Sequence, residues 1–294
     1  MHLPGTTLLA LSLLGLTATP AASQALNLDQ LAVSVQPVLD VAGPQQRTAI
    51  KAVYLIYCAK DSSAGTGFLI ARGILITNEH VVGTCREPDL IAIAPTNKRV
   101  HFSLVIVDKI RDLALLKPTE TLGGGLELAN DADPAPGTTV STWGYPLMYN
   151  DTSPLLSVGY VAGFRRENKN GANVKHLIVN GAFNHGNSGG PLLMAGGTKV
   201  VGIVVATYHF FPEYVGKVID DLQKPRGGIY SGFSRTDANG TKTDLSDSQV
   251  VGAMLQEFYY RTQVMIGEAI SVSELQTLIS EKQSELGSLN GHVR

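Results

Sequence analysis

Short apolar runs separated by glycine-containing turns make up the chain between Ile50 and Pro118. They lie at residues 52–57, 68–70, 74–77, 90–93, 102–107 and 113–116, and residues 62–67 have the composition of a hairpin turn. Short strands at close spacing are typical of an antiparallel barrel or sandwich rather than of a parallel sheet. This part of the sequence therefore predicts a first β-barrel over residues 50–122.

A second set of apolar runs follows a connector that is rich in glycine and proline. The connector covers residues 119–137, and the runs lie at residues 139–146, 155–163, 176–179, 191–194 and 200–207. A further run at residues 264–270 has the same character but comes after a long gap. We expect a second barrel built from residues 123–208 and 262–286, which makes the protein all-β.

The gap, residues 209–261, has a helical rather than a strand-like pattern. Apolar residues recur at helical spacing between positions 250 and 258, and Ser246 with Gln249 fits a capping box ahead of them. We interpret this segment as a helical insertion in the second barrel.

Both ends of the predicted barrels carry further helical signals. Ser271 with Glu274 fits a second capping box, so a C-terminal helix is expected, and Gly287 is suited to end it. Ahead of the first barrel, residues 26–49 are interpreted as a lead-in arm, because Pro37, Gly43 and Pro44 interrupt its weak helical pattern.

The first 25 residues have the pattern of an export signal. They contain no charged side chain, an apolar run at residues 7–16, and Ser23, Gln24 and Ala25 as a small-x-small cleavage site. The alternative, an uncleaved membrane anchor, needs about 20 continuous apolar residues, and Pro20 cuts this run short. We predict a signal peptide over residues 1–25 and a protein that is secreted or periplasmic, without membrane contact after signal removal.

The chain has two cysteines, Cys58 and Cys85. In an exported protein an even pair predicts a disulfide, with two buried thiols or a metal site as the alternatives. No histidine stands at zinc-type spacing beside them, which disfavours a metal.

Composition excludes some classes of partner. The chain has 294 residues, of which 44% are apolar and 16% charged, with a formal net charge of −2. This is a globular composition. Because no basic run occurs, neither nucleic acid nor an anionic membrane is expected as a partner.

The sequence N-H-G-N-S-G-G-P-L, residues 184–192, carries the strongest chemical signal. A serine that attacks a carbonyl needs small neighbours, so that backbone N–H groups can reach the developing oxyanion. Gly186, Gly189 and Gly190 provide that room around Ser188. Taken alone, the same residues would also suit a glycine-rich hairpin loop.

Two further residues complete a catalytic pattern. His80 follows the run at residues 74–77, and Asp112 opens the run at residues 113–116. The order His, Asp, Ser is that of the chymotrypsin template and differs from subtilisin and the α/β-hydrolases. The sequence resembles the trypsin/chymotrypsin-type serine proteases, and its motifs are most similar to those of the HtrA/Deg-like branch. These motifs are G-T-G-F-L-I, T-N-E-H-V-V, D-L-A-L-L and G-N-S-G-G-P-L.

The resemblance implies a fold and a set of roles. The fold would be two antiparallel six-stranded barrels with a triad assembled across their interface. Ser188 would be the nucleophile, His80 the general base and then acid, and Asp112 the group that holds the imidazole. The N–H groups of Gly186 and Ser188 would form the oxyanion hole. Asp108 is the rival to Asp112, but the run after Asp112 matches the family's buried strand, whereas Asp108 suits a turn cap.

The resemblance also implies a polypeptide substrate, no cofactor and no metal. Too little chain follows Gly287 for the PDZ domain of the HtrA plan. Asn187 stands where trypsin has the aspartate that pairs with its new N-terminus, so activation by N-terminal trimming is not expected. The specificity pocket would be lined by Ala182 and Phe183 on one side and by Val205, Ala206 and Thr207 on the other.

The same residues raise two other functions. A protease-fold protein with a silent triad, acting as a binding or chaperone-like module, is the main alternative. An α/β-hydrolase esterase does not fit, because G-N-S-G-G is not G-x-S-x-G and the chain order of its triad differs. The sequence therefore predicts a serine endopeptidase that cleaves after small or medium apolar residues.

Overall fold

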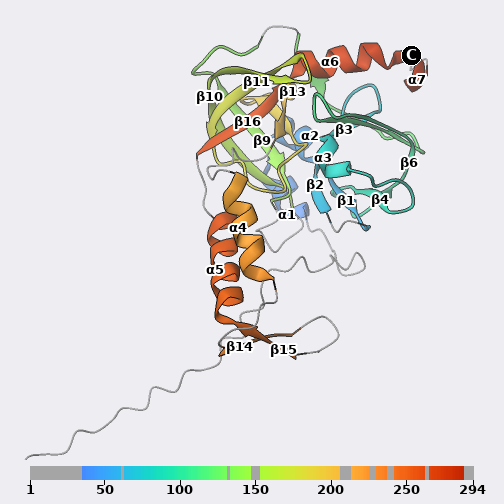
Figure 1. The fold of residues 1–294 in the computed structure, drawn as a ribbon. Helices are drawn as coiled ribbons and strands as arrows, with labels where there is room; N and C mark the ends of the chain where they lie inside the picture. The colour runs from blue at the N-terminus through green and yellow to red at the C-terminus, as the bar shows by residue number, and fades with distance from the viewer. Residues whose placement is uncertain are drawn as a thin grey trace, which may run out of the picture. The chain divides into compact units, whose positions relative to one another are not determined.

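The computed structural model describes residues 35–60, 63–130, 133–146, 153–205, 213–224, 230–236, 242–261 and 265–287. The predicted signal peptide and the first part of the arm lie outside these residues. Contacts divide the chain into two compact units. Phe211–Arg261 form the smaller unit, and Ala25–Phe210 with Thr262–Arg294 form the larger one, which holds both barrels (Figure 1).

The first barrel has the strand order β5-β4-β1-β2-β3-β7-β6, and its neighbouring strands are antiparallel. Only His101 separates β5 from β6, so the two behave as one interrupted strand that joins both edges of the sheet. The short helix α3 (Glu79–Val82) follows β3. The strands are β1 (Val53–Cys58), β2 (Ser63–Leu69), β3 (Leu75–Thr77), β4 (Leu90–Ile93), β5 (Arg99–Val100), β6 (Phe102–Asp108) and β7 (Leu113–Pro118).

The second barrel is closed by a pairing between β12 and β13, so that six antiparallel strands form a ring in the order β12-β9-β10-β11-β16-β13. The short strand β8 adds a parallel pairing on β13. The prediction of two antiparallel six-stranded barrels is confirmed. The strands are β8 (Glu127–Leu128), β9 (Thr139–Gly144), β10 (Leu155–Lys169), β11 (Ala172–Gly181), β12 (Pro191–Met194), β13 (Lys199–Val205) and β16 (Ile266–Ser271).

One apolar core runs through both barrels. Its buried residues include Val53 and Phe68 of the first barrel and Trp143, Ile203 and Ile270 of the second. Burying side chains from both barrels in one cluster removes apolar surface from water. This shared core holds the two barrels against each other and brings their facing loops together.

The arm ahead of the first barrel forms two helices, α1 (Gln36–Val41) and α2 (Pro44–Ala52). The prolines expected to interrupt a helix instead stand at the start of each one. Proline is tolerated there because its missing N–H would have no helical partner. The first barrel consequently begins at Val53 rather than at residue 50, and Ile50 is a buried residue of α2.

The predicted hairpin turn at residues 62–67 is wrong, since Ser63 to Leu69 form strand β2. Gly65 and Gly67 are needed there for close packing rather than for a turn. A Cβ on Gly65 would lie 2.7 Å from the Val81 side chain and 3.2 Å from the Ser188 carbonyl oxygen. The glycine thus allows the serine loop to approach β2.

The C-terminal helix α6 (Val272–Glu281) runs from β16 towards the first barrel, and the short helix α7 (Gln283–Leu286) ends at Gly287 (Figure 1). Ser271 caps α6 as predicted, by accepting a hydrogen bond from Ser273 N–H. The predicted capping box is wrong in its other half. The Glu274 carboxylate turns away from the cap and accepts from Lys175 N–H at 3.0 Å.

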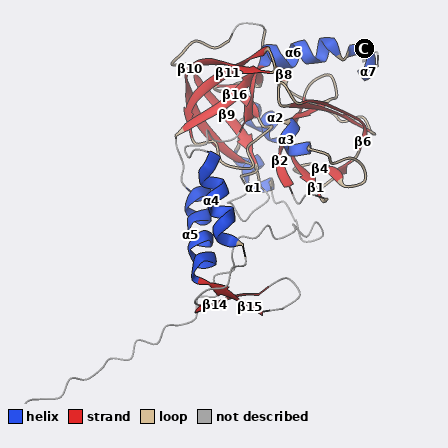
Figure 2. Ribbon diagram, viewed as in Figure 1, coloured by secondary structure: helices blue, strands red, loops and turns tan. Residues whose placement is uncertain are grey.

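The smaller unit contains a pair of helices and a hairpin (Figure 2). Its elements are α4 (Glu213–Gln223), β14 (Tyr230–Thr236), β15 (Lys242–Ser246) and α5 (Asp247–Arg261). The predicted contact between Ser246 and Gln249 ahead of α5 is present, because Ser246 N–H donates to Gln249 Oε1 at 2.9 Å, which is one of the two bonds of a capping box. The helices are joined by Gln223 Nε2, which donates to Gln256 Oε1 at 2.6 Å.

No helix in the described ranges combines the length and the apolar character that crossing a membrane requires. The described residues also contain no group of three or more His, Cys, Asp or Glu side chains placed to hold a metal ion.

The predicted disulfide between Cys58 and Cys85 is present and buried. It links the end of β1 to the segment that follows α3, the helix that carries His80. The bridge therefore restrains this helix against the first barrel.

Reduction of the disulfide is expected to lower the free energy of unfolding. The sequence separation is 27 residues, and the chain-entropy relation gives about 3.5 kcal/mol for a loop of this length. Urea unfolding with and without a reductant measures the difference. A Cys58→Ser/Cys85→Ser variant should not respond to the reductant, and a wild-type midpoint that also fails to respond would contradict the prediction.

Candidate active site

His80 and Asp112 are joined by two hydrogen bonds. His80 Nδ1 lies 2.8 Å from Asp112 Oδ2, and the backbone N–H of His80 donates to Asp112 Oδ1 at 2.9 Å. Because a carboxylate only accepts hydrogen bonds, Nδ1 carries a proton, and in the neutral ring Nε2 then has the lone pair. The His80 side chain is 47% exposed and that of Asp112 14% exposed. The imidazole is thus oriented by the aspartate while remaining open to a reactant.

Asp112 is held from its backbone as well. It is the last residue of the turn between β6 and β7, and it adopts a left-handed conformation with φ of 54°. Its carbonyl oxygen accepts from Asn78 Nδ2 at 2.9 Å, and Asn78 is fully buried immediately before α3. Asn78 therefore fixes the turn that carries Asp112 against the start of the helix that carries His80.

Ser188 reaches the first barrel through Thr66 of β2. Thr66 N–H donates to the Ser188 carbonyl at 2.8 Å, and Thr66 Oγ1 donates to the Gly186 carbonyl at 2.6 Å. The Thr66 carbonyl in turn accepts from Thr77 Oγ1 at 2.7 Å. Thr77 ends β3 three residues before His80. One buried threonine thus connects the serine loop of the second barrel to the strand that leads into the histidine helix.

The serine loop depends on glycine at two positions. Gly189 has φ of 83°, and a Cβ there would lie 2.2 Å from both the Thr66 carbonyl oxygen and Thr77 Oγ1. Gly186 has φ of 97°, a conformation that side chains rarely adopt. Ser188 itself is 4% exposed. The loop is folded tightly, with its serine close to the first barrel.

The residues predicted to line a specificity pocket differ in their surroundings. Ala182 and Val205 are half-buried. Phe183 is 2% exposed and belongs to the core of the second barrel, where its ring lies so close to Gly267 that a Cβ there would be 2.2 Å from it. Ala206 and Thr207 lie outside the described residues.

Sequence reasoning missed Thr66 and Asn78 as parts of this site. Both stood inside motifs that carried the family resemblance, G-T-G-F-L-I and T-N-E-H-V-V, but neither has a side chain that catalyses. Their importance comes from hydrogen bonds to residues 34 and 120 positions away. The available signal was a polar residue next to an apolar run in each motif, because a polar side chain that folding buries needs a hydrogen-bond partner.

Comparisons with known proteins indicate a peptidase domain. Residues 65–203 match the family described as "Trypsin-like peptidase domain". A probable periplasmic serine endoprotease DegP-like from Pseudomonas fulva is 32% identical over 63% of this chain and 40% of its own length. The mitochondrial serine protease HTRA2 from Bos taurus is 31% identical over 48% of this chain and 31% of its own. Residues 65–203 are thus similar to trypsin-like peptidase domains, and the two relatives named here are serine proteases of the HtrA and DegP-like type.

Solved structures share the fold of this peptidase domain. The active form of the Rv3671c protease from M. tuberculosis matches with a TM-score of 0.55 and 17% identity, covering 85% of this chain and 88% of the other. The HtrA-type protease AlgW, solved with a tripeptide, matches with a TM-score of 0.53 and 21% identity, covering 80% and 61%. The chain spans well under half the length of the curated relatives it matches. The matched share of the relative's length ranges from 22% to 40%.

Proposed function

We propose that the protein is a serine endopeptidase that hydrolyses peptide bonds through His80, Asp112 and Ser188. The observation that carries the proposal is the pair of hydrogen bonds from His80 to Asp112, because together they orient the ring and leave Nε2 as a base. The contact from Thr66 to the Ser188 carbonyl adds to it by tying the serine loop to the same barrel.

The reaction would proceed in two halves. Ser188 Oγ attacks the substrate carbonyl carbon while His80 Nε2 takes the hydroxyl proton. The C–N bond then breaks, and His80 gives this proton to the leaving amine, which leaves an acyl group on Ser188. In the second half a water molecule attacks the ester, its proton passes through His80 to Ser188 Oγ, and the carboxylic acid product departs. Asp112 stabilises the imidazolium in both halves.

The oxyanion formed in each half needs hydrogen-bond donors. We assign this role to the backbone N–H groups of Gly186 and of the nucleophile Ser188 itself, both of which lie in the loop that Thr66 holds. Removing one such donor typically costs about 10² to 10³ in rate.

Covalent labelling tests the reactive serine directly. A fluorophosphonate probe should label the wild-type protein at Ser188 and inhibit peptide hydrolysis in step with labelling. A folded protein that the probe leaves unmodified would favour the alternative, a protease-fold binding or chaperone-like module.

We infer that the protein works outside the cytoplasm. A disulfide persists in oxidising compartments, and the Cys58–Cys85 bridge supports such a location. The probable periplasmic DegP-like relative from Pseudomonas fulva is consistent with it. The export signal proposed for residues 1–25 would provide the route, and N-terminal sequencing of the exported protein should find Leu26 first.

We further propose cleavage after small or medium apolar residues such as Ala, Val or Leu. None of the residues that the sequence assigns to the pocket carries a charge; they are Ala182, Phe183, Val205, Ala206 and Thr207, of which Phe183 is packed in the core of the second barrel. They could not repay the desolvation of a substrate ion, a penalty of several kcal/mol. Discrimination among apolar side chains should be modest, about 1–3 kcal/mol per methylene.

A peptide library with the residue before the cut bond varied measures this preference as kcat/KM. An Ala182→Asp variant, expected to gain activity towards Arg and Lys, is the positive control for the assigned pocket. If Arg, Lys or Glu precedes the cut bond in the best wild-type substrates, the pocket assignment is wrong.

A further inference from the structure

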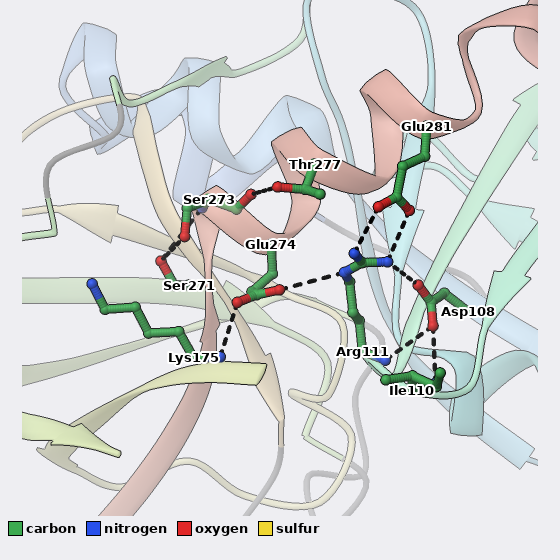
Figure 3. Close-up of polar contacts among 9 residues, drawn as sticks. All are labelled: Asp108, Ile110, Arg111, Lys175, Ser271, Ser273, Glu274, Thr277 and Glu281. Carbon is green, nitrogen blue, oxygen red and sulfur yellow. Dashed lines mark hydrogen bonds and ion pairs between the residues drawn. The ribbon is translucent and has the colours of Figure 1, made fainter. Parts of the chain in front are cut away.

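Arg111, the residue before Asp112, sits among three carboxylates (Figure 3). Its guanidinium donates to Glu281 through two nitrogens, at 3.0 and 2.9 Å, and to Asp108 Oδ2 at 2.6 Å. Its Nε lies 3.4 Å from Glu274 Oε2. A guanidinium matches this arrangement because its planar fork can bind a carboxylate through two donors at once.

These contacts join segments that are far apart in sequence. Asp108 and Arg111 belong to the β6–β7 turn of the first barrel, whereas Glu274 and Glu281 stand on α6, which follows the last strand of the second barrel. Glu274 and Glu281 are seven residues apart and so project from the same face of the helix. α6 therefore contacts the turn through residues near both ends of the helix.

The cluster is partly removed from water. The side chains of Arg111, Asp108 and Glu274 are 20%, 13% and 16% exposed, while that of Glu281 is 49% exposed. Burial alone would lower the pKa of Arg111, but its hydrogen bonds to Asp108 and Glu281 outweigh burial and raise it. Burial alone would raise the pKa of Asp108, but the bonds from Arg111 lower it. Arg111 and Asp108 therefore stabilise each other's charged forms.

The turn itself has a conformation that needs support. Asp108 Oδ1 accepts from the backbone N–H groups of Ile110 and Arg111, at 2.9 and 3.0 Å. Asp112 follows with its left-handed φ of 54°. A non-glycine residue held in that region costs free energy and persists only when its surroundings determine it. Asn78 supports one end of the turn through the Asp112 carbonyl, and the Arg111 cluster supports the other.

We propose that Arg111 is a positioning residue, which clamps the Asp112 turn to the C-terminal helix through Glu281 and Glu274 and so holds the Asp112 carboxylate against His80. The inference rests on the proposed function, in which Asp112 orients the general base. It makes α6 part of the catalytic apparatus, although no residue of that helix is assigned to the reaction itself.

Arg111→Met tests the clamp, because methionine keeps an apolar stem but removes the fork and its charge. We expect kcat to fall about 10- to 100-fold with KM unchanged, the order of effect that a misplaced catalytic group produces. Arg111→Lys should restore part of the loss, since it keeps the charge without the bidentate geometry. The NMR signal of the His80 Nδ1 proton, held in the bond to Asp112, should weaken or shift in the methionine variant.

Lys117→Met is the matched control. Lys117 Nζ donates to the Leu286 carbonyl at 3.2 Å, so it also ties the first barrel to the C-terminal helices, but at the far end of β7 from Asp112. This variant should keep the wild-type kcat and the His80 signal. If Arg111→Met does not fold, Glu281→Gln, which weakens the same clamp, takes its place with the same expected direction.

The outcomes are separable. An Arg111→Met protein that keeps the wild-type kcat and His80 signal, or a Lys117→Met protein that loses as much of both, would overturn the positioning role. A wild-type protein that the fluorophosphonate probe leaves unmodified would refute the proposed function. The His80 signal would then still report on the clamp, because it does not depend on turnover.

Discussion

Ser188→Ala is expected to abolish fluorophosphonate labelling and to lower kcat for peptide hydrolysis by a factor on the order of 10⁶, the size seen when a triad nucleophile is removed. The fold should persist, because the contacts that hold this loop use the backbone. Thr66 N–H donates to the Ser188 carbonyl, and Gly189 N–H donates to the Val204 carbonyl at 2.7 Å. Neither bond needs the serine hydroxyl.

Ser103→Ala is the control for this experiment. Ser103 is an exposed serine of β6 whose hydroxyl donates to the Lys117 carbonyl at 3.3 Å, outside the proposed site. It should label and turn over like the wild type. An alanine variant of Ser188 that is folded by circular dichroism yet retains wild-type turnover would exclude Ser188 as the nucleophile.

Asp112→Asn is expected to lower kcat by about 10⁴ while leaving the fold intact, because an amide at this position can stabilise the wrong tautomer of its histidine. In the wild type both carboxylate oxygens accept hydrogen bonds from His80, one from its ring and one from its backbone. An asparagine could offer only one oxygen, and its NH₂ group would face either the ring or the backbone N–H. Steady-state kinetics, with circular dichroism as the test of folding, measure the effect.

Asp108→Asn separates the two candidate aspartates. Asp108 caps the turn, as expected from the sequence, and its carboxylate binds Arg111 rather than a histidine. An asparagine keeps an oxygen for the backbone N–H groups and leaves the bonds from Arg111 to Glu281 in place. Its effect on kcat should be about 10-fold at most, the lower end of what misplacing a catalytic group costs. A larger loss for Asp108→Asn than for Asp112→Asn would reverse the assignment.

The sequence by itself determined the features that depend on local pattern. Short apolar runs bounded by turn residues produce strands in both barrels, and β1, in which all six residues are buried, is an example. Ser246 with Gln249 identified the start of α5 because a capping box is satisfied within four consecutive residues. The short, contiguous motifs around His80, Asp112 and Ser188 predicted a serine peptidase, and the trypsin-like family match over residues 65–203 supports that class.

Local pattern was also the source of the errors. Gly65 and Gly67 suggested a turn, but they lie in β2, where the space for a side chain is taken by Val81, Ile56 and neighbouring backbone. Pro37 and Pro44 suggested interruptions but stand in the first turns of α1 and α2. A glycine or proline limits what the backbone can do, and only its neighbours in space decide which of the permitted uses applies.

Only the tertiary structure decided what holds the candidate triad together. Thr66 binds a loop 120 residues away, Asn78 binds the Asp112 turn, and Arg111 reaches carboxylates 163 and 170 residues further along the chain. Glu274, which the sequence assigned to a capping box, instead accepts hydrogen bonds from Arg111 and from Lys175 N–H through its two carboxylate oxygens. The physical reason is that a buried or half-buried polar group needs a partner of matching chemistry. The sequence specifies the need, whereas the packing of the two barrels and α6 supplies the partner.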